Sequence, residues 1–171
     1  MVRLESLIST IEKTPVSVGF LKSIVPSNVR VLHYEQLKDY NRSTLFQSKD
    51  AVIVLIPHKT LKKGHYICIL PKKTHISYFS SLGLGPSQEL VKLKHEENFL
   101  SSILGTNFVY NRTRLQNQAN YSINTCGAFV FVRTKFHKLK NREFLDLFRG
   151  ISLQSPDDIV SVLALLSFMD K

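Results

Sequence analysis

The chain has 171 residues, 43% of them hydrophobic, and its 23 lysines and arginines against 13 acids give a formal net charge of +10. We predict a single domain over residues 1–171, because this length allows one buried core and is short for two. Two cysteines exclude a disulfide framework and a cysteine-rich zinc site, and no apolar run reaches the roughly 20 residues that a membrane-spanning helix needs.

The first half of the chain changes from helical to strand periodicity. Apolar residues three and four apart predict helices over 3–13 and 18–25, each ending near a proline. Short β-branched or aromatic runs then predict strands, which are residues 29–34, 50–57, 65–70 and 75–80. The four-residue turn 71–74 makes the last two strands antiparallel neighbours.

The second half is mainly helical. A helix is expected over 87–104 and a strand over 107–111, followed by a polar loop. Three further helices are predicted, which begin near residues 126, 141 and 155. The last has Ser155 as N-cap, Pro156 at its first position and two aspartates in its first turn. The expected fold class is α+β, with a central mixed or antiparallel sheet surrounded by helices.

Cys126 lies where a polar loop becomes an apolar helix, in the stretch SINTCGAFVFV. At a helix N-terminus, free backbone N–H groups and the positive end of the helix dipole favour thiolate over thiol. This is the environment that a nucleophile needs. Cys68, within the apolar strand YICIL, has instead the pattern of a small buried hydrophobe.

A cysteine nucleophile requires a base, and histidine is the usual one. His65 follows Gly64 and begins an apolar strand, so its ring is expected at the end of the sheet. His58 competes for this role, but Pro57 and Lys59 beside it are typical of an exposed turn. His65 is therefore the candidate base.

These residues carry a resemblance to a known family. GHYICILPKKTHISYFSSLGLGPS, then a loop with glutamines, then NTCGAFVF resembles the adenovirus maturation protease (adenain) and the ubiquitin-like-protein proteases. The resemblance covers about residues 50–135 and implies a cysteine endopeptidase with His65 and Cys126 as the catalytic pair. Cys126 would open a buried helix.

Two positions depart from the family pattern. Where the family has an acid after the second strand of the hairpin, this chain has Ser80. A hydroxyl can orient the imidazole, although it cannot stabilise imidazolium as a carboxylate does, so an orienting group elsewhere stays open. The oxyanion glutamine of the family corresponds best to Gln116, with Gln118 as the alternative, and Asn120 could donate over a shorter reach.

The resemblance implies cleavage of viral capsid or core precursor proteins at small, glycine-containing sites, as in a viral, virophage or Polinton-type maturation protease. The alternatives are a deubiquitinating or deSUMOylating enzyme, and a catalytically weakened basic domain that binds nucleic acid or associates with the capsid. We expect a monomer that acts in the virion and host-cell interior, without a secretory signal or a membrane partner.

No metal or organic cofactor is expected for the chemistry, and the resemblance implies DNA or an activating peptide as candidate activators. The net charge of the chain also fits a polyanion partner. The basic residues cluster locally rather than in one tail. The candidate nucleic-acid contacts are Lys62, Lys63, Lys72, Lys73, Arg133, Lys135, Lys138 and Lys140.

Overall fold

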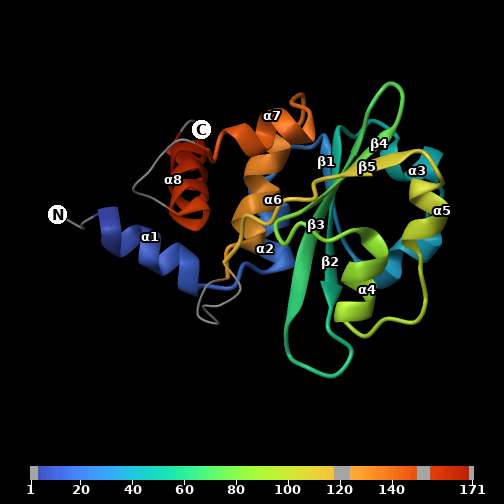
Figure 1. Ribbon diagram of the computed structural model, residues 1–171, viewed down its shortest axis with the longest axis horizontal. Helices are drawn as coiled ribbons and strands as arrows, with labels where there is room; N and C mark the ends of the chain where they lie inside the picture. The colour runs from blue at the N-terminus through green and yellow to red at the C-terminus, as the bar shows by residue number, and fades with distance from the viewer. Residues whose placement is uncertain (1–3, 118–123, 150–154, 170–171) are drawn as a thin grey trace.

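The computed structural model describes residues 4–117, 124–149 and 155–169 and is built around one five-stranded sheet (Figure 1). The strands lie side by side in chain order and are β1 (Val29–His33), β2 (Ala51–Pro57), β3 (Gly64–Pro71), β4 (Ile76–Ser80) and β5 (Phe108–Tyr110). The outer pairs β1–β2 and β4–β5 are parallel, whereas β2–β3 and β3–β4 are antiparallel. The predicted α+β class with a mixed sheet is confirmed.

Helices cover both faces of the sheet, as Figure 1 shows. One face carries α1 (Leu4–Lys13), α2 (Val18–Ile24), α6 (Cys126–Lys135), α7 (Asn141–Asp146) and α8 (Pro156–Met169). The other carries the 3₁₀ helix η1 (Tyr34–Asp39) with α3 (Arg42–Phe46), α4 (Pro86–Lys92) and α5 (Leu100–Leu104). Helix α6 lies between the sheet and α8, so its residues are enclosed on both sides.

The alternation of side chains along each strand divides the apolar residues into two cores. In β3, Tyr66 and Cys68 point into the core under α6, whereas Ile67 and Ile69 point into the core under α4 and α5. Both faces are covered, which explains why the central strands read as continuous apolar runs. The same alternation decides on which face each polar side chain at a strand end lies.

One predicted helix is interrupted. The sequence pattern predicts a single helix over 87–104, but α4 ends at Lys92 and α5 starts only at Leu100. Lys94 has a φ of 63°, which an α-helix does not allow, and the buried His95 ring is 2.6 Å from the carbonyl oxygen of Pro57. This tertiary contact overrides the helical periodicity and leaves α4 as a short helix beside the end of β3.

Candidate active site

Cys126 is the first residue of α6, and Gly127–Thr134 behind it are all buried. A helix that is buried on all sides is held firmly by its neighbours. Helix α6 packs against β3, and Figure 1 shows it next to the sheet. The thiol therefore has a fixed position at the edge of the α6 core.

Gly127 allows the chain to pass close to this helix. A Cβ atom at residue 127 would lie 2.8 Å from Cβ of Val16, a separation that real Cβ atoms do not adopt. Val16 belongs to the segment that joins α1 to α2, and its carbonyl oxygen accepts a 2.9 Å hydrogen bond from the Tyr66 hydroxyl. The Cys-Gly pair thus has a packing reason in this fold.

A groove of about 700 Å³ opens at Cys126. Its walls come from the segment between α1 and α2, from the β2–β3 hairpin, and from the residues before α6. The lining residues include Val16, Ser17, Gly19, Leu55, Lys62, Lys63, Gly64, Tyr66, Asn124 and Cys126. The start of α6 is therefore accessible from this groove.

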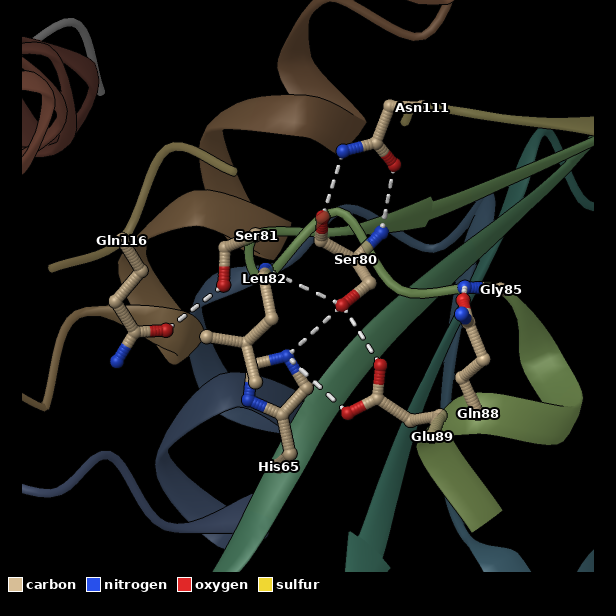
Figure 2. A network of polar contacts seen from close by, with 9 residues as sticks. All are labelled: His65, Ser80, Ser81, Leu82, Gly85, Gln88, Glu89, Asn111 and Gln116. Carbon is tan, nitrogen blue, oxygen red and sulfur yellow. Dashed lines mark hydrogen bonds and ion pairs between the residues drawn. The ribbon is translucent and has the colours of Figure 1, made fainter. Parts of the chain in front are cut away.

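His65 lies on the opposite face of β3 from Tyr66, in contact with Ser80 and Glu89 (Figure 2). Ser80 ends β4 opposite Ile67, and this register brings its side chain to the face that His65 occupies. Ser80 Oγ is 3.3 Å from His65 Nε2 and donates a 2.8 Å hydrogen bond to Glu89 Oε2. The second oxygen, Glu89 Oε1, lies 3.8 Å from His65 Nε2.

This chain of contacts fixes the tautomer of His65. While Glu89 is ionised, Ser80 donates its single hydroxyl proton to the carboxylate, so Ser80 Oγ accepts from His65 Nε2–H. Nδ1 is then the unprotonated nitrogen and carries the lone pair. His65 is thereby prepared to accept a proton at Nδ1.

Glu89 is a site residue that the sequence reasoning missed. Its side chain is completely buried, and its helix α4 presents Pro86, Leu90 and Leu93 on the same buried face. These positions follow the i, i+3, i+4, i+7 spacing of an apolar stripe, in which a glutamate is out of place. That misplaced charge was the available signal. The acid absent from position 80 is thus present nine residues later, behind the Ser80 hydroxyl.

Burial sets the protonation of this end of the site. Removal from water lowers the pKa of His65 to about 3 and raises the pKa of Glu89 to about 7, and the hydrogen bond from Ser80 only partly opposes the rise. At neutral pH the 3.8 Å contact consequently joins a neutral imidazole to a carboxyl group in mid-titration. The charged pair can form only when a proton reaches His65.

The thiol also differs from the sequence prediction. Burial raises the pKa of Cys126, while hydrogen bonding from the backbone of Tyr66 and Gly127 lowers it by less. The helix N-terminus therefore does not by itself yield a resting thiolate, because loss of hydration outweighs it. Glu89 is close enough for its charge to raise the pKa of Cys126 further, so both ends belong to one electrostatic environment.

No hydrogen bond joins Cys126 to His65 among the contacts of the described residues. The ring reaches the site from the α4 face of β3, and the thiol reaches it from the α6 face. In unliganded enzymes such catalytic contacts are often long and tighten when substrate binds.

Gln116 is held beside the turn that follows Ser80. The carbonyl oxygen of Ser81 accepts from the backbone N–H groups of Leu115 and Gln116, and Ser81 Oγ donates a 2.8 Å hydrogen bond to Gln116 Oε1. In Figure 2 the Gln116 amide nitrogen points away from Ser81. The amide is thus oriented by its oxygen, which leaves its N–H₂ group as donor. Gln118 and Asn120 lie outside the described residues.

The turn itself is stabilised by Asn111 and Gly83. The Asn111 side chain makes two hydrogen bonds to the backbone of Ser80, through Oδ1 to N–H and through Nδ2 to the carbonyl oxygen. Gly83 has a φ of 68° and donates its N–H to the Ser80 carbonyl. Only glycine accepts this φ readily. Ser80 is therefore held from both its backbone and its side chain.

The candidate nucleic-acid residues divide into internal and exposed groups. Arg133 is fully buried, and its guanidinium donates to the carbonyls of Phe136 and Leu139 and to Asn141. Lys72 donates to the carbonyls of His137 and Leu139, in the segment that follows α6. These two cations hold the segment between α6 and α7 and do not form a surface patch. The exposed cations are Lys62, Lys63, Lys73, Lys135, Lys138 and Lys140.

Within residues 4–117, 124–149 and 155–169, no group of three or more His, Cys, Asp or Glu side chains could hold a metal ion. No helix in these ranges combines the length and apolar character needed to cross a bilayer.

Comparison with solved structures finds similar folds at low identity. The central domain of the uncharacterized Lpg1148 protein from Legionella pneumophila has a TM-score of 0.43 and 11% identity, over 91% of this chain and 96% of that one. The ASFV pS273R protease has a TM-score of 0.44 and 10% identity, over 81% of this chain and 60% of that chain.

The SUMO protease Ulp1, with its catalytic cysteine oxidized to a sulfinic acid, has a TM-score of 0.37 and 17% identity, over 96% of this chain and 76% of that one. No family model and no curated protein sequence matches the chain. Similarity at this level concerns shape, so the case for chemistry depends on the side chains described above.

Proposed function

We propose that the chain is a cysteine peptidase in which Cys126 is the nucleophile and His65 the general base. The observation that carries this proposal is the His65–Ser80–Glu89 chain of contacts, which leaves the lone pair on His65 Nδ1. A thiol at the start of a buried helix and beside a groove completes the requirements for acyl transfer.

The proposed reaction begins from a neutral thiol and a neutral imidazole. As Cys126 Sγ attacks the peptide carbonyl carbon, its proton passes to His65 Nδ1, and the carbonyl π electrons move to the oxygen. When the C–N bond breaks, His65 returns the proton to the leaving amine. Water then attacks the thioester, gives its proton to His65, and the thiol is regenerated as the acid product leaves.

Glu89 and Gln116 act on the charges that develop. While His65 carries the extra proton, the Glu89 carboxylate stabilises the imidazolium through Ser80 and through its own Oε1. The Gln116 amide N–H₂ and the backbone N–H of Cys126 would donate to the oxyanion, and one such donor is worth about 3–4 kcal/mol. No metal is needed in these steps.

For the substrate we propose precursor proteins of a virus or related element, cleaved after small residues such as glycine. The support is the resemblance of the hairpin and Cys-Gly motifs, together with a groove that an extended chain must enter. Cleavage behind the Gly-Gly tail of a ubiquitin-like modifier is the alternative, because it needs the same narrow path.

DNA is the proposed polyanion partner. Lys72 binds the carbonyls of His137 and Leu139, so the β3–β4 turn lies beside the segment after α6. Exposed Lys73 from the turn and Lys138 and Lys140 from the segment therefore form one local basic surface. Binding there would weaken steeply as salt rises, since it would release counterions. A weakened basic binding domain is the rival that keeps this surface without turnover.

The deciding experiment is labelling by a short peptide vinyl sulfone that ends in Gly-Gly, with and without DNA, located by peptide mass mapping. We expect adduct on Cys126 and none on Cys68, whose pKa burial raises to about 12. His65→Ala should abolish the adduct, and His58→Ala, the matched control in an exposed turn, should retain it. Equal labelling of the wild type and His65→Ala would contradict the proposal.

The same reagent on full-length ubiquitin-like proteins separates the two substrate classes. Faster labelling by the protein probe than by the short peptide would favour the deconjugating alternative. No labelling by either probe, with DNA present, would favour the binding-domain rival.

A further inference from the structure

Asp157 is a buried carboxylate at the start of α8, outside the His65–Ser80–Glu89 contacts. Its side chain has no exposed surface, and both of its oxygens accept hydrogen bonds. Thr125 Oγ1 donates to Oδ1, and the backbone N–H of Asn117 donates to Oδ2 at 2.9 Å. No ion pair involves Asp157 among the described residues. Burial raises the pKa of its carboxyl group, and the two hydrogen bonds oppose that rise.

Each of the two donors is adjacent in sequence to a residue of the proposed active site. Thr125 directly precedes Cys126, and its carbonyl oxygen accepts from Phe129 in the first turn of α6. Asn117 directly follows Gln116. One carboxylate is therefore bonded to the neighbour of the proposed nucleophile and to the neighbour of the proposed oxyanion donor.

Helix capping does not require this arrangement. Both aspartates lie in the first turn of α8, but of the two only the Asp158 side chain caps the helix. Ser155 Oγ and Asp158 Oδ2 are 2.7 Å apart, and each side chain accepts from the other residue's backbone N–H. Asp157 points inward instead and contacts two segments that lie 32 and 40 residues before it in the chain. A buried acid is costly when no cation is beside it, and none is among the described residues, so its presence needs another reason.

We propose that Asp157 is a positioning residue that sets the separation between the Cys126 thiol and the Gln116 amide. This proposal rests on the proposed function, because it assigns both segments to one reaction. A carboxylate has an acceptor on each side, so it can hold both donors at once, whereas an asparagine side chain has a single acceptor oxygen. Loss of either bond would let one segment shift against the other.

The test compares Asp157→Asn with Asp158→Asn, which changes the neighbouring, half-buried acid in the same way. We expect Asp157→Asn to lower kcat by about 10- to 100-fold with KM within about threefold, because a displacement near 1 Å costs rate rather than binding. Asp158→Asn should leave kcat within about twofold and only lower the melting temperature through the cap.

A second pair of variants separates positioning from general loss of stability. Thr125→Val removes the hydroxyl donor at equal volume, and we expect it to reproduce most of the loss of kcat. Thr125→Ser restores the donor and should recover kcat to within about threefold, although it leaves a small void. Equal kcat for the valine and serine variants would overturn the proposal.

Backbone exchange provides a measurement independent of turnover. In Asp157→Asn, the amide hydrogen of Asn117 should exchange at least about tenfold faster, while amides in β2 and β3 keep their rates. Unchanged exchange at Asn117, or unchanged kcat, means that Asp157 does not position these segments. A further outcome is that the wild type cleaves no substrate while Asp157→Asn still speeds exchange at Asn117. In that case the proposed function fails, and the hydrogen bonds of Asp157 have a structural role only.

Discussion

The imidazole end and the thiol end of the site are built in different ways. His65 is oriented by a polar network in which Ser80, Asn111 and Glu89 hold one another through side-chain hydrogen bonds. Cys126 is held by apolar packing of α6, by close contact of Gly127 with Val16, and by the Asp157 bridge. The polar end can therefore respond to protonation, whereas the packed end fixes geometry.

The two buried acids, Glu89 and Asp157, differ in the same way as the two ends of the site. Both oxygens of Asp157 accept hydrogen bonds, but Glu89 Oε1 has no hydrogen-bond partner among the described residues and faces His65 Nε2 at 3.8 Å. An unsatisfied buried oxygen is costly in the resting state. In the proposed reaction this oxygen accepts from the imidazole when the ring is charged. Glu89 therefore has an oxygen available for a new hydrogen bond, and Asp157 does not.

The largest effect on activity is expected for Glu89→Gln, which tests whether the charge of Glu89 is needed. The glutamine oxygen can still accept from Ser80, but the side chain cannot stabilise an imidazolium by charge. We expect kcat/KM to fall about 100-fold. Steady-state cleavage of a peptide substrate measures this, with Glu97→Gln, an exposed acid after α4, as the matched control. A loss in Glu97→Gln of similar size would show that charge at a distance is responsible.

Although Glu89→Gln should lower activity, it should raise the free energy of unfolding at high pH. The folded pKa of Glu89, about 7, lies above its ordinary 4.5, so its stabilisation is fully present below about pH 4.5 and is lost as pH rises through 7. Glu89→Gln should escape this loss and exceed the wild type by up to about 3 kcal/mol at pH 8. Urea unfolding at pH 5 and pH 8 measures the difference, which should shrink toward pH 5.

His65 adds the reverse pH dependence. Its pKa is lowered from 6.5 to about 3, so the stability that depends on a neutral ring is present above pH 6.5 and is lost as pH falls toward 3. Acid unfolding should persist in Glu89→Gln. If it disappears there, the carboxyl group and not the imidazole causes it.

At the thiol end, packing is tested by Gly127→Ala. The added methyl group would meet Val16 Cβ at 2.8 Å, so the segment before α2 must move away from α6. We expect a loss of about 1–3 kcal/mol in the free energy of unfolding and a higher KM, because Val16 lines the groove. Urea unfolding and cleavage kinetics measure the two effects.

The smallest expected effect is its matched control, Gly19→Ala in α2. The nearest atom to a Cβ there is Ser17 Oγ at 3.9 Å, so the change meets no obstacle and favours the helix. We expect a gain of up to about 1 kcal/mol in the free energy of unfolding. A loss comparable to that of Gly127→Ala would mean that any methyl group in this region is harmful.

Sequence patterns predicted the strands well because both faces of the sheet are covered and the strands are strongly apolar. They also placed Cys126 at a helix start and His65 near a strand start, because these are local features. The break after Lys92 could not be predicted, since it depends on the contact between His95 and Pro57. The partners of Thr125 and Asn117 likewise come from α8, more than thirty residues away in the chain.

Glu89 illustrates the limit of comparing position with position. The matching position for the acid has Ser80, and only the register of β4 with β3 and the placement of α4 reveal a carboxylate behind the hydroxyl. The thiolate that the helix start favours meets a related limit. Local sequence specifies the helix end, but the burial that raises the pKa of Cys126 comes from the whole fold.

The contrast between the two cysteines also gives the molecule a natural attachment point. Cys68 is sealed in the sheet, with a pKa raised to about 12, and Cys126 opens onto the groove. The unmodified chain should therefore accept a single maleimide fluorophore, at Cys126. A dye there would sense what enters the groove, so peptide docking and its competition by inhibitors could be followed by fluorescence without introducing any substitution.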